Sequence, residues 1–146
     1  MRLKGCPNEY SGLSRNETRN LGSHVVKELH LTILIVDDEM DICYLLKGIL
    51  KQKNFDSSVA NTLLDAQKAL DKEPPFLLIL DNRLPDGMGV DFIPYVKEKY
   101  PSVKILMVSA FDSHTDKSNA YDRGADFFIG KPLNRDVINK VIDKLM

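Results

Sequence analysis

The stretch Leu31–Glu39, which reads LTILIVDDE, decides the fold. Six aliphatic or β-branched residues follow one another without interruption and end in three carboxylates. A short continuous run of this kind is typical of a strand buried on both faces of a parallel sheet. Open parallel sheets bind their ligands beyond the carboxyl ends of the strands. The acidic residues are therefore expected at the ligand-binding edge of a sheet.

Four further runs of strand length follow at intervals that leave room for a helix. They are Phe55–Ala60, Phe76–Leu80, Val103–Val108 and Asp126–Gly130. Three of these runs are followed directly by a residue with reactive chemistry, namely Asp81, Ser109 and Lys131. If the strands lie side by side, three carboxylates, one hydroxyl and one ammonium group gather on one rim. Such a set suits a divalent cation and a phosphoryl group.

The segments between the runs contain apolar residues at helical spacing and predict five helices. The expected helices are Glu39–Lys53, Thr62–Lys72, Val90–Lys99, Thr115–Arg123 and a last helix capped by Asn134. Met40 and Val137 belong to the predicted buried stripes of the first and last helices, and Pro94 should kink the third or delay its start. Right-handed crossovers then give an α/β fold, a doubly wound five-stranded parallel sheet with helices on both faces.

Length and composition fit one soluble domain. The chain has 146 residues, with 20 Lys and Arg against 21 Asp and Glu, so no basic excess points to nucleic acid or a membrane surface. Cys6 and Cys43 show no pairing or metal-binding pattern, and Cys43 is expected in the core. These features indicate a cytoplasmic protein.

Residues 1–30 differ in composition from the rest of the chain. They lack sustained periodicity and the apolar segment of a secretory signal, so a mobile leader or a vector-derived extension is expected. One extra turn of helix is expected at His24–His30. The domain itself is expected to span residues 31–146.

Several motifs occur at the predicted strand ends in a characteristic order. They are Ile35–Glu39, Leu80–Asp81 with Pro85 and Gly89 following, Val108–Ala110, Gly124–Asp126 and Lys131–Pro132. With these motifs, Leu31–Met146 closely resembles the receiver (phosphoacceptor) domain of two-component response regulators. Each motif is weak alone, but their shared order over about four-fifths of the chain is specific. The resemblance implies a flavodoxin-like fold with strand order 2-1-3-4-5 and a cis bond between Lys131 and Pro132.

The resemblance assigns roles to the acidic residues. Asp81 becomes the phosphoacceptor, which should be exposed in the loop after its strand and free of a competing salt bridge. Asp37, Asp38 and Asp81, with the backbone carbonyl of Arg83, become ligands of Mg²⁺. The residues alone also allow Asp81 to cap the next turn, and allow the acidic pair to start the first helix. Asp38 is expected to do both.

Three further residues complete the site that the resemblance implies. Lys131 offers a point charge to a phosphoryl oxygen, and Ser109 donates its hydroxyl to the same group. Phe128 corresponds to an aromatic switch residue that rotates inward when Ser109 moves. Simple packing at the edge of the sheet remains an alternative for Phe128.

The expected function is a phosphorylation-controlled switch and not a turnover enzyme. A histidine kinase or phosphotransfer protein would supply the phosphoryl group, and a downstream protein or output domain would bind the 109–146 face. A dimer that forms on phosphorylation is also consistent with the family, and direct nucleic-acid or membrane binding is not expected. The chain ends after the last predicted helix, which suits either a stand-alone receiver or a part of a larger regulator or hybrid kinase.

Two other functions fit a related α/β sheet. A phosphatase with an aspartyl-phosphate intermediate is disfavoured, because Arg83 stands where such enzymes carry a second acid. A flavin-binding protein is disfavoured by the acidic rim, which would repel the flavin phosphate.

The lifetime of the phosphoryl group should depend on two side chains beside the site. Family geometry places Arg83 and Phe111 nearest to an attacking water. Neither can act as a base on water, so a long-lived phosphoryl state is expected.

Overall fold

The computed structural model describes residues 20–21, 24–25 and 31–145. The chain divides into two units, Met1–His30 and Leu31–Met146. In the first unit, strands β1 (Asn20–Leu21) and β2 (His24–Val25) pair antiparallel. The extra turn of helix is therefore wrong at His24 and Val25, and its remainder lies outside the described residues. The predicted mobile leader also falls mainly outside them and stays a prediction.

The second unit alternates strands and helices. Its strands are β3 (Thr32–Val36), β4 (Asp56–Ala60), β5 (Leu77–Asp81), β6 (Arg83–Leu84), β7 (Gly87–Met88), β8 (Lys104–Ser109) and β9 (Phe127–Gly130). Its helices are α2 (Met40–Gln52), α3 (Leu63–Lys72), α4 (Gly89–Lys99), α5 (His114–Arg123) and α6 (Arg135–Leu145). The five predicted strands and five predicted helices are all present, with boundaries within one or two residues of those expected.

The main sheet has the order β4-β3-β5-β8-β9. All four neighbouring pairs are parallel, and the register aligns Val36 with Leu80, and Asp81 with Val108. In terms of these five strands the order is 2-1-3-4-5, which is the flavodoxin-like arrangement. It places β3 and β5 side by side at the point where the strand order reverses.

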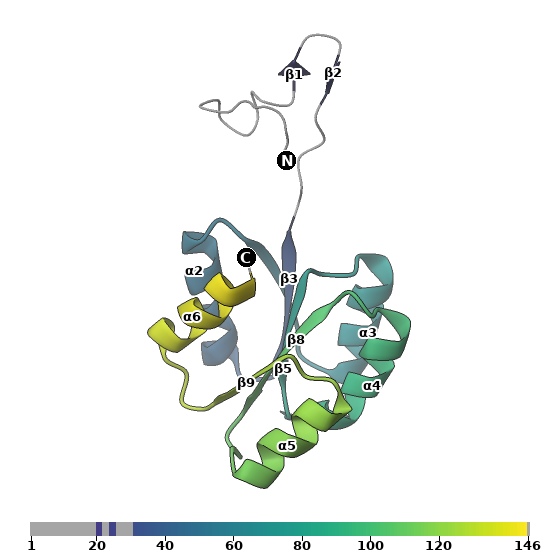
Figure 1. Ribbon diagram of the computed structural model, residues 1–146, viewed down its shortest axis with the longest axis vertical. Helices are drawn as coiled ribbons and strands as arrows, with labels where there is room; N and C mark the ends of the chain where they lie inside the picture. The colour runs from purple at the N-terminus through teal and green to yellow at the C-terminus, as the bar shows by residue number, and fades with distance from the viewer. Residues whose placement is uncertain (1–19, 22–23, 26–30, 146) are drawn as a thin grey trace. The chain divides into compact units, whose positions relative to one another are not determined.

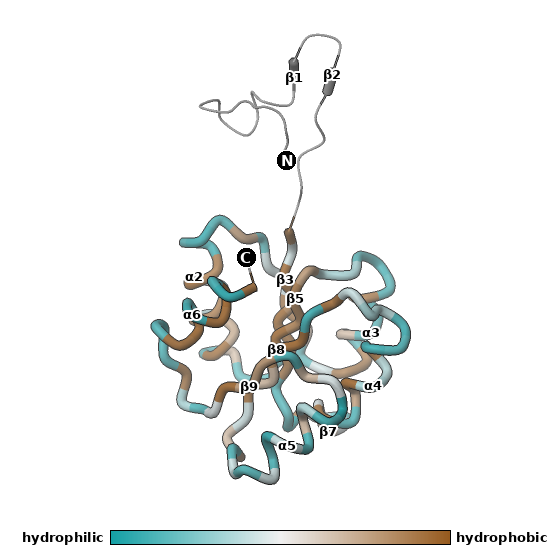
Figure 2. Tube along the Cα trace, in the orientation of Figure 1, coloured by the Kyte–Doolittle hydropathy of each residue, from teal (hydrophilic) through white to brown (hydrophobic). Residues whose placement is uncertain are grey.

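The sheet separates two hydrophobic cores. Residues of β3 alternate between them: Ile33 and Ile35 pack with α2 and α6, whereas Leu34 and Val36 pack with α3, α4 and α5. Figure 1 shows the two helices on one side of the sheet and the three helices on the other. Figure 2 shows hydrophobic strands in the centre and hydrophilic segments along the outer helices.

Several details differ from the sequence-based expectations. The side chains of Met40 and Val137 are 71% and 40% exposed, so neither belongs to a buried stripe. Met40 is the first residue of α2, and Val137 lies in the first turn of α6 beside Ile138, which is the residue that this turn buries. Helix α4 contains Pro94 but starts at Gly89, so the expected late start is wrong. The predicted kink stays a prediction.

The segment after β5 contains structure that the sequence did not predict. Strands β6 and β7 form a short antiparallel hairpin in which Arg83 pairs with Met88. Gly89 follows this hairpin, and a Cβ atom there would collide with the backbone carbonyl of Asp81. Glycine at this position therefore allows α4 to begin directly against the end of β5.

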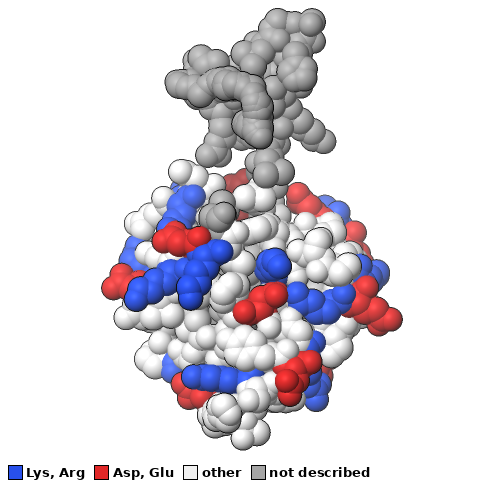
Figure 3. Space-filling model, in the orientation of Figure 1, with Lys and Arg blue, Asp and Glu red and all other residues white. Residues whose placement is uncertain are grey.

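The surface carries both signs of charge. On the face of the second unit seen in Figure 3, basic and acidic side chains are interspersed. Among the described residues, no helix combines the length and apolar character needed to cross a membrane.

Candidate functional site at the carboxyl edge of the sheet

Three polar side chains are buried in the described part of the chain: Asp37, Asp81 and Ser109, at 2%, 5% and 3% exposure. Each lies at the carboxyl end of a strand, after β3, at the end of β5 and at the end of β8 respectively. Because β3, β5 and β8 are adjacent and parallel, their carboxyl ends meet at one edge. Burial of polar groups is costly, so their gathering at one edge marks a site.

Backbone contacts fix Asp37 at the switch point of the sheet. Its N–H donates to the carbonyl of Ala60 at 3.1 Å, and its carbonyl accepts from Asn61 Nδ2 at 2.8 Å. The Cys43 thiol donates to the same carbonyl at 3.3 Å. One carboxylate oxygen accepts from the N–H of Glu39 at 2.9 Å, just before α2 begins. The acidic segment therefore directly precedes α2 and faces the site. The double role expected of Asp38 stays a prediction.

Four carboxylates converge on one point. Oxygen atoms of Asp37, Asp38, Glu39 and Asp81 all lie within 4.8 Å of one another. Burial and then the charge of Asp37 raise the pKa of Asp81 to about 6. Burial also raises the pKa of Asp37, against the opposing effect of the Glu39 N–H and of Lys131. An all-oxygen donor set with excess negative charge fits a hard divalent cation such as Mg²⁺.

Lys131 is the basic residue at the centre of this cluster. Its Nζ lies 3.1 Å from Glu39 Oε2, 3.2 Å from Asp81 Oδ1 and 3.4 Å from Asp37 Oδ2. Burial opposes the charged ammonium, but the hydrogen bond to Glu39 and the charges of Asp37 and Asp81 raise the pKa of Lys131 overall. The backbone N–H of Lys131 donates to the carbonyl of Ser109 at 2.8 Å, and the bond to Pro132 is cis as expected.

Two expectations for Asp81 are corrected. Asp81 is the last residue of β5 and is buried, with Lys131 and three other carboxylates around its side chain and Gly89 close to its backbone carbonyl. It also forms a salt bridge with Lys131, since that ammonium group is its nearest counter-charge. A group that reacts with Asp81 must therefore enter the cleft and compete for Lys131.

A cleft of about 290 Å³ opens above these residues. Its lining is formed by Asp38, Glu39, Asp81, Arg83, Ser109, Ala110, Phe111 and Lys131. The site residues predicted from sequence thus line this cleft, except Asp37, whose carboxylate is buried but belongs to the same acidic cluster. The hydroxyl of Ser109 accepts from the N–H of Phe111 at 3.0 Å. The guanidinium carbon of Arg83 lies 4.4 Å from the centre of the Phe111 ring.

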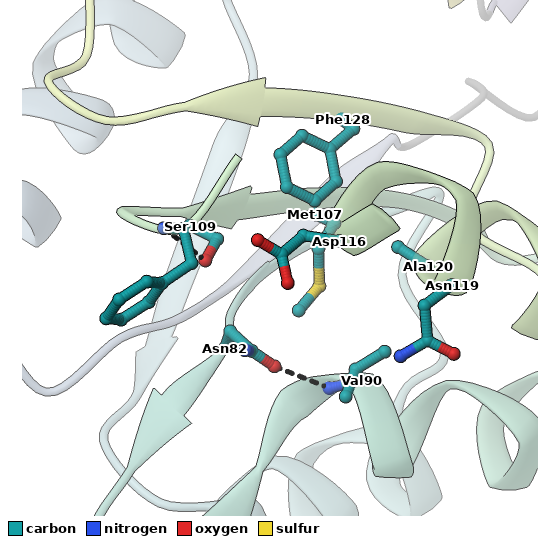
Figure 4. A pocket seen from close by; sticks show the side chains of 9 residues that line it. Asn82, Val90, Met107, Ser109, Asp116, Asn119, Ala120 and Phe128 are labelled. Carbon is teal, nitrogen blue, oxygen red and sulfur yellow. Dashed lines mark hydrogen bonds between the residues drawn. The ribbon is translucent and has the colours of Figure 1, made fainter. Parts of the chain in front are cut away.

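A second, smaller cavity of about 30 Å³ lies beside Ser109. Figure 4 shows Phe128 and Met107 on neighbouring strands at this cavity, with Asp116 and Asn119 contributed by α5. The ring of Phe128 is half-buried, and it packs against the core under α3, α4 and α5. Phe128 therefore borders a space that is connected to Ser109 by shared lining residues.

The sequence matches the profile of the response regulator receiver domain over residues 33–143. The chain belongs to this family. It contains a receiver domain of two-component systems, whose members interact with histidine kinases and output domains. The phosphatase and flavin-binding alternatives have no support from this match.

Relatives of this receiver domain include both long and short proteins. The response regulator protein PilR of Pseudomonas aeruginosa is 37% identical over 101 residues, which are 69% of this chain and 23% of PilR. The chemotaxis protein CheY of Listeria monocytogenes is 32% identical over 115 residues, which are 78% of this chain and 97% of CheY. The aligned segment therefore corresponds to about a quarter of the first protein and nearly all of the second.

Solved receiver structures share the fold. The receiver domain of a LuxO repressor protein from Vibrio parahaemolyticus superposes with a TM-score of 0.76 at 26% identity, covering 80% of this chain and 90% of that one. The beryllofluoride-activated NtrC4 receiver domain, solved as a dimer, gives a TM-score of 0.74 at 30% identity, with 78% and 94% coverage.

Two residues at the site were not assigned a role from sequence. Glu39 contributes an oxygen to the acidic cluster and holds Lys131, and its position directly after Asp38 was the available signal. Asn82 caps α4 from outside the helix: its carbonyl accepts from Gly89 N–H at 2.6 Å and its side chain from Val90 N–H at 3.0 Å. No local pattern predicts this cap, because its partners lie seven and eight residues further on.

Proposed function

We propose that this receiver domain is a phosphorylation-controlled switch in which Asp81 accepts a phosphoryl group from a phosphohistidine in the presence of Mg²⁺. The observation that carries the proposal is the gathering of the three buried polar side chains, Asp37, Asp81 and Ser109, with Lys131 at one edge of the sheet. A structural role alone would not require a buried carboxylate cluster with a raised pKa.

Transfer requires a carboxylate oxygen of Asp81 as nucleophile. It forms a bond to phosphorus while the phosphorus–nitrogen bond to the donor histidine breaks. The imidazole nitrogen keeps the electron pair of that bond and takes a proton from solvent. Asp37, Asp38, Asp81 and the carbonyl of Arg83 would hold Mg²⁺, which neutralises charge on the transferring group. Arg83 supports this assignment because it lines the same cleft.

Lys131 and Ser109 stabilise the product in this proposal. Lys131 exchanges its contact with Asp81 for a phosphoryl oxygen, while Glu39 and Asp37 keep the ammonium in place. Ser109 turns its hydroxyl toward the phosphoryl group and then loses the contact from Phe111 N–H. Both movements draw the end of β8 and the start of the following loop toward Asp81.

Phe128 would report this movement to the surface. The cavity beside Ser109 has only about the size needed for a water molecule, so it is too small for a phenyl ring. The ring can move inward only when Ser109 or α5 shifts, which couples the two positions. Helix α5 presents mostly polar residues and buries a single side chain, Ala120, so little packing opposes a shift. A downstream partner would bind the 109–146 face, and a phosphorylation-dependent dimer would use the same face.

The domain would promote its own phosphorylation and dephosphorylation without turning over a separate substrate. Arg83 and Phe111 contact one another beside Asp81, and neither side chain can accept a proton from water. This pair supports a long-lived phosphoryl state suited to sustained signalling or to relay. The protein would then act in the cytoplasm, where its kinase would phosphorylate it.

Mass spectrometry after treatment with acetyl phosphate and Mg²⁺ tests the proposal. The wild-type protein should gain one acid-labile phosphoryl group, and the Asp81→Asn variant should gain none. The control variant Asp122→Asn makes the same chemical change at an exposed residue of α5 and should be phosphorylated normally. An adduct that persists in Asp81→Asn refutes the assignment of Asp81.

A further inference from the structure

The hairpin after the phosphoacceptor is fastened to a neighbouring helix by one side chain. The carboxylate of Asp86 accepts hydrogen bonds from two backbone N–H groups at the start of α3, from Leu63 at 2.8 Å and from Leu64 at 3.0 Å. These contacts join residues that are more than 20 positions apart. They also lower the pKa of Asp86, because both N–H groups favour the ionised carboxylate.

The same hairpin carries Arg83 on its first strand. Arg83 pairs with Met88 in the antiparallel ladder, so the backbone of Arg83 moves with the turn that contains Asp86. The other end of the segment is fixed at Asn82, which accepts from the first N–H groups of α4. Two caps on two helices thus fix the six-residue segment between Arg83 and Met88 from both sides.

The side chain of Arg83 extends from this anchored segment to the loop after β8. Its guanidinium group covers the ring of Phe111, a residue that is 49% exposed and belongs to the loop after β8. Both side chains line the cleft above Asp81. An exposed cation–π contact is worth only about 0.5–1 kcal/mol, so a loosely held Arg83 would leave the ring easily.

We propose that Asp86 is a positioning residue that sets the lifetime of the phosphoryl group by holding Arg83 over Phe111. This inference rests on the proposed phosphorylation of Asp81. Hydrolysis forms a bond from a water oxygen to phosphorus and breaks the bond from phosphorus to the Asp81 carboxylate oxygen. It releases inorganic phosphate and a proton and restores the carboxylate. The Arg83–Phe111 pair covers the approach of this water, and Asp86 keeps the cover closed without touching the site.

The decay of phosphorylated protein in the presence of Mg²⁺ tests this role. Asp86→Ala should shorten the lifetime by about threefold to tenfold, the range expected when a capping contact that orders a segment is lost. Asp86→Asn keeps one acceptor oxygen and should give an intermediate lifetime.

Thr62→Ala is the matched control. Thr62 caps the same helix α3 by accepting from Asp65 N–H at 3.0 Å, but among the described residues it forms no hydrogen bond with the hairpin. Its loss should weaken the helix and leave the lifetime unchanged. If Thr62→Ala shortens the lifetime as much as Asp86→Ala does, the effect belongs to α3 and the inference is overturned.

A double substitution tests whether Asp86 affects the phosphoryl lifetime through the side chain of Arg83. Arg83→Ala keeps the backbone carbonyl and removes only the cover, so Asp86→Ala should have no further effect in this background. A persisting effect would show that Asp86 acts elsewhere. If the wild-type protein takes up no phosphoryl group, the proposed function fails; if it does and Asp86→Ala decays at the wild-type rate, only the role of Asp86 fails.

Discussion

Replacing Asp81, the proposed phosphoacceptor, should stabilise the metal-free protein. Asp81 is 5% exposed and lies within the cluster formed with Asp37, Asp38 and Glu39. Burial, followed by the charge of Asp37, raises its pKa from 3.8 to about 6. The folded state therefore resists ionisation of this group, and Asp81→Asn removes that cost while nearly preserving the shape of the side chain.

The sign and size of the effect follow from proton linkage. The unfolded chain loses the Asp81 proton near pH 3.8 and the folded protein near pH 6. Stability therefore falls as the pH rises between these values and stays level above them. A pKa difference of about two corresponds to about 3 kcal/mol at neutral pH. This figure already includes the attraction of Lys131, so Asp81→Asn should raise the unfolding free energy by about 2–3 kcal/mol at neutral pH.

Urea unfolding followed by circular dichroism measures this gain in a buffer that contains EDTA. The gain should be largest at neutral pH and should fall below about 1 kcal/mol near pH 4. Added Mg²⁺ should reduce the difference in unfolding free energy between Asp81→Asn and the wild type, because a cation stabilises the wild-type carboxylate more than the amide of the variant. Asp122→Asn controls for the change in net charge and should leave stability unchanged. A gain that does not vary with pH, or a loss of stability at neutral pH, would refute the electrostatic reasoning.

Four further outcomes are expected. Asp38→Ala should weaken Mg²⁺ binding, measured by titration calorimetry, and slow phosphorylation by at least about tenfold; full retention of both would show that Asp38 is not a ligand. Phe111→Glu and Arg83→Asn should each shorten the phosphoryl lifetime by about tenfold, because both substitutions supply a group that can orient water; decay no faster than wild type would contradict this. Changes in amide chemical shift on adding a phosphoryl mimic with Mg²⁺ should occur mainly in residues 109–131. Changes confined to helices α2 and α3 would contradict the proposed role of the 109–146 face. Burial, and then the charges of Asp37 and Asp38, raise the pKa of Cys43 to about 11. Near pH 8, alkylation of Cys43 should therefore be about a hundredfold slower in the folded protein than in the unfolded protein, as followed by mass spectrometry of its peptide. Equal rates would count against the burial of this thiol.

Much of the architecture could be predicted from local sequence. Apolar runs such as Ile33–Val36 form buried strands because a parallel sheet covered on both faces buries the side chains on both sides of the strand. Caps also follow local rules: Thr62 accepts from Asp65 N–H, and Ser113 and Asp116 form a capping box at α5. The strand order came from the family resemblance, because periodicity alone does not say which strands are neighbours.

The residues that form the site could also be predicted from sequence, because they lie at the ends of predicted strands. Asp37, Asp81, Ser109 and Lys131 each follow or end a strand, and parallel strands bring all such positions to one edge. The residue types then indicated the chemistry, since carboxylates suit a hard cation and an ammonium group suits a phosphoryl oxygen.

Pairings between distant residues required the tertiary structure. Lys131 and Glu39 are 92 positions apart, and nothing in either segment specifies their contact. The same holds for the hydrogen bonds that Asp86 accepts from the start of α3 and for the contact of Arg83 with the Phe111 ring. The burial of Asp81 and its salt bridge with Lys131 likewise depend on segments that are far apart in the sequence. Local sequence determines which residues lie at the edge of the sheet, because strand periodicity shows where each strand ends. Which charged groups meet there, and the pKa values that result, depend on distances that are set only when the whole chain has packed.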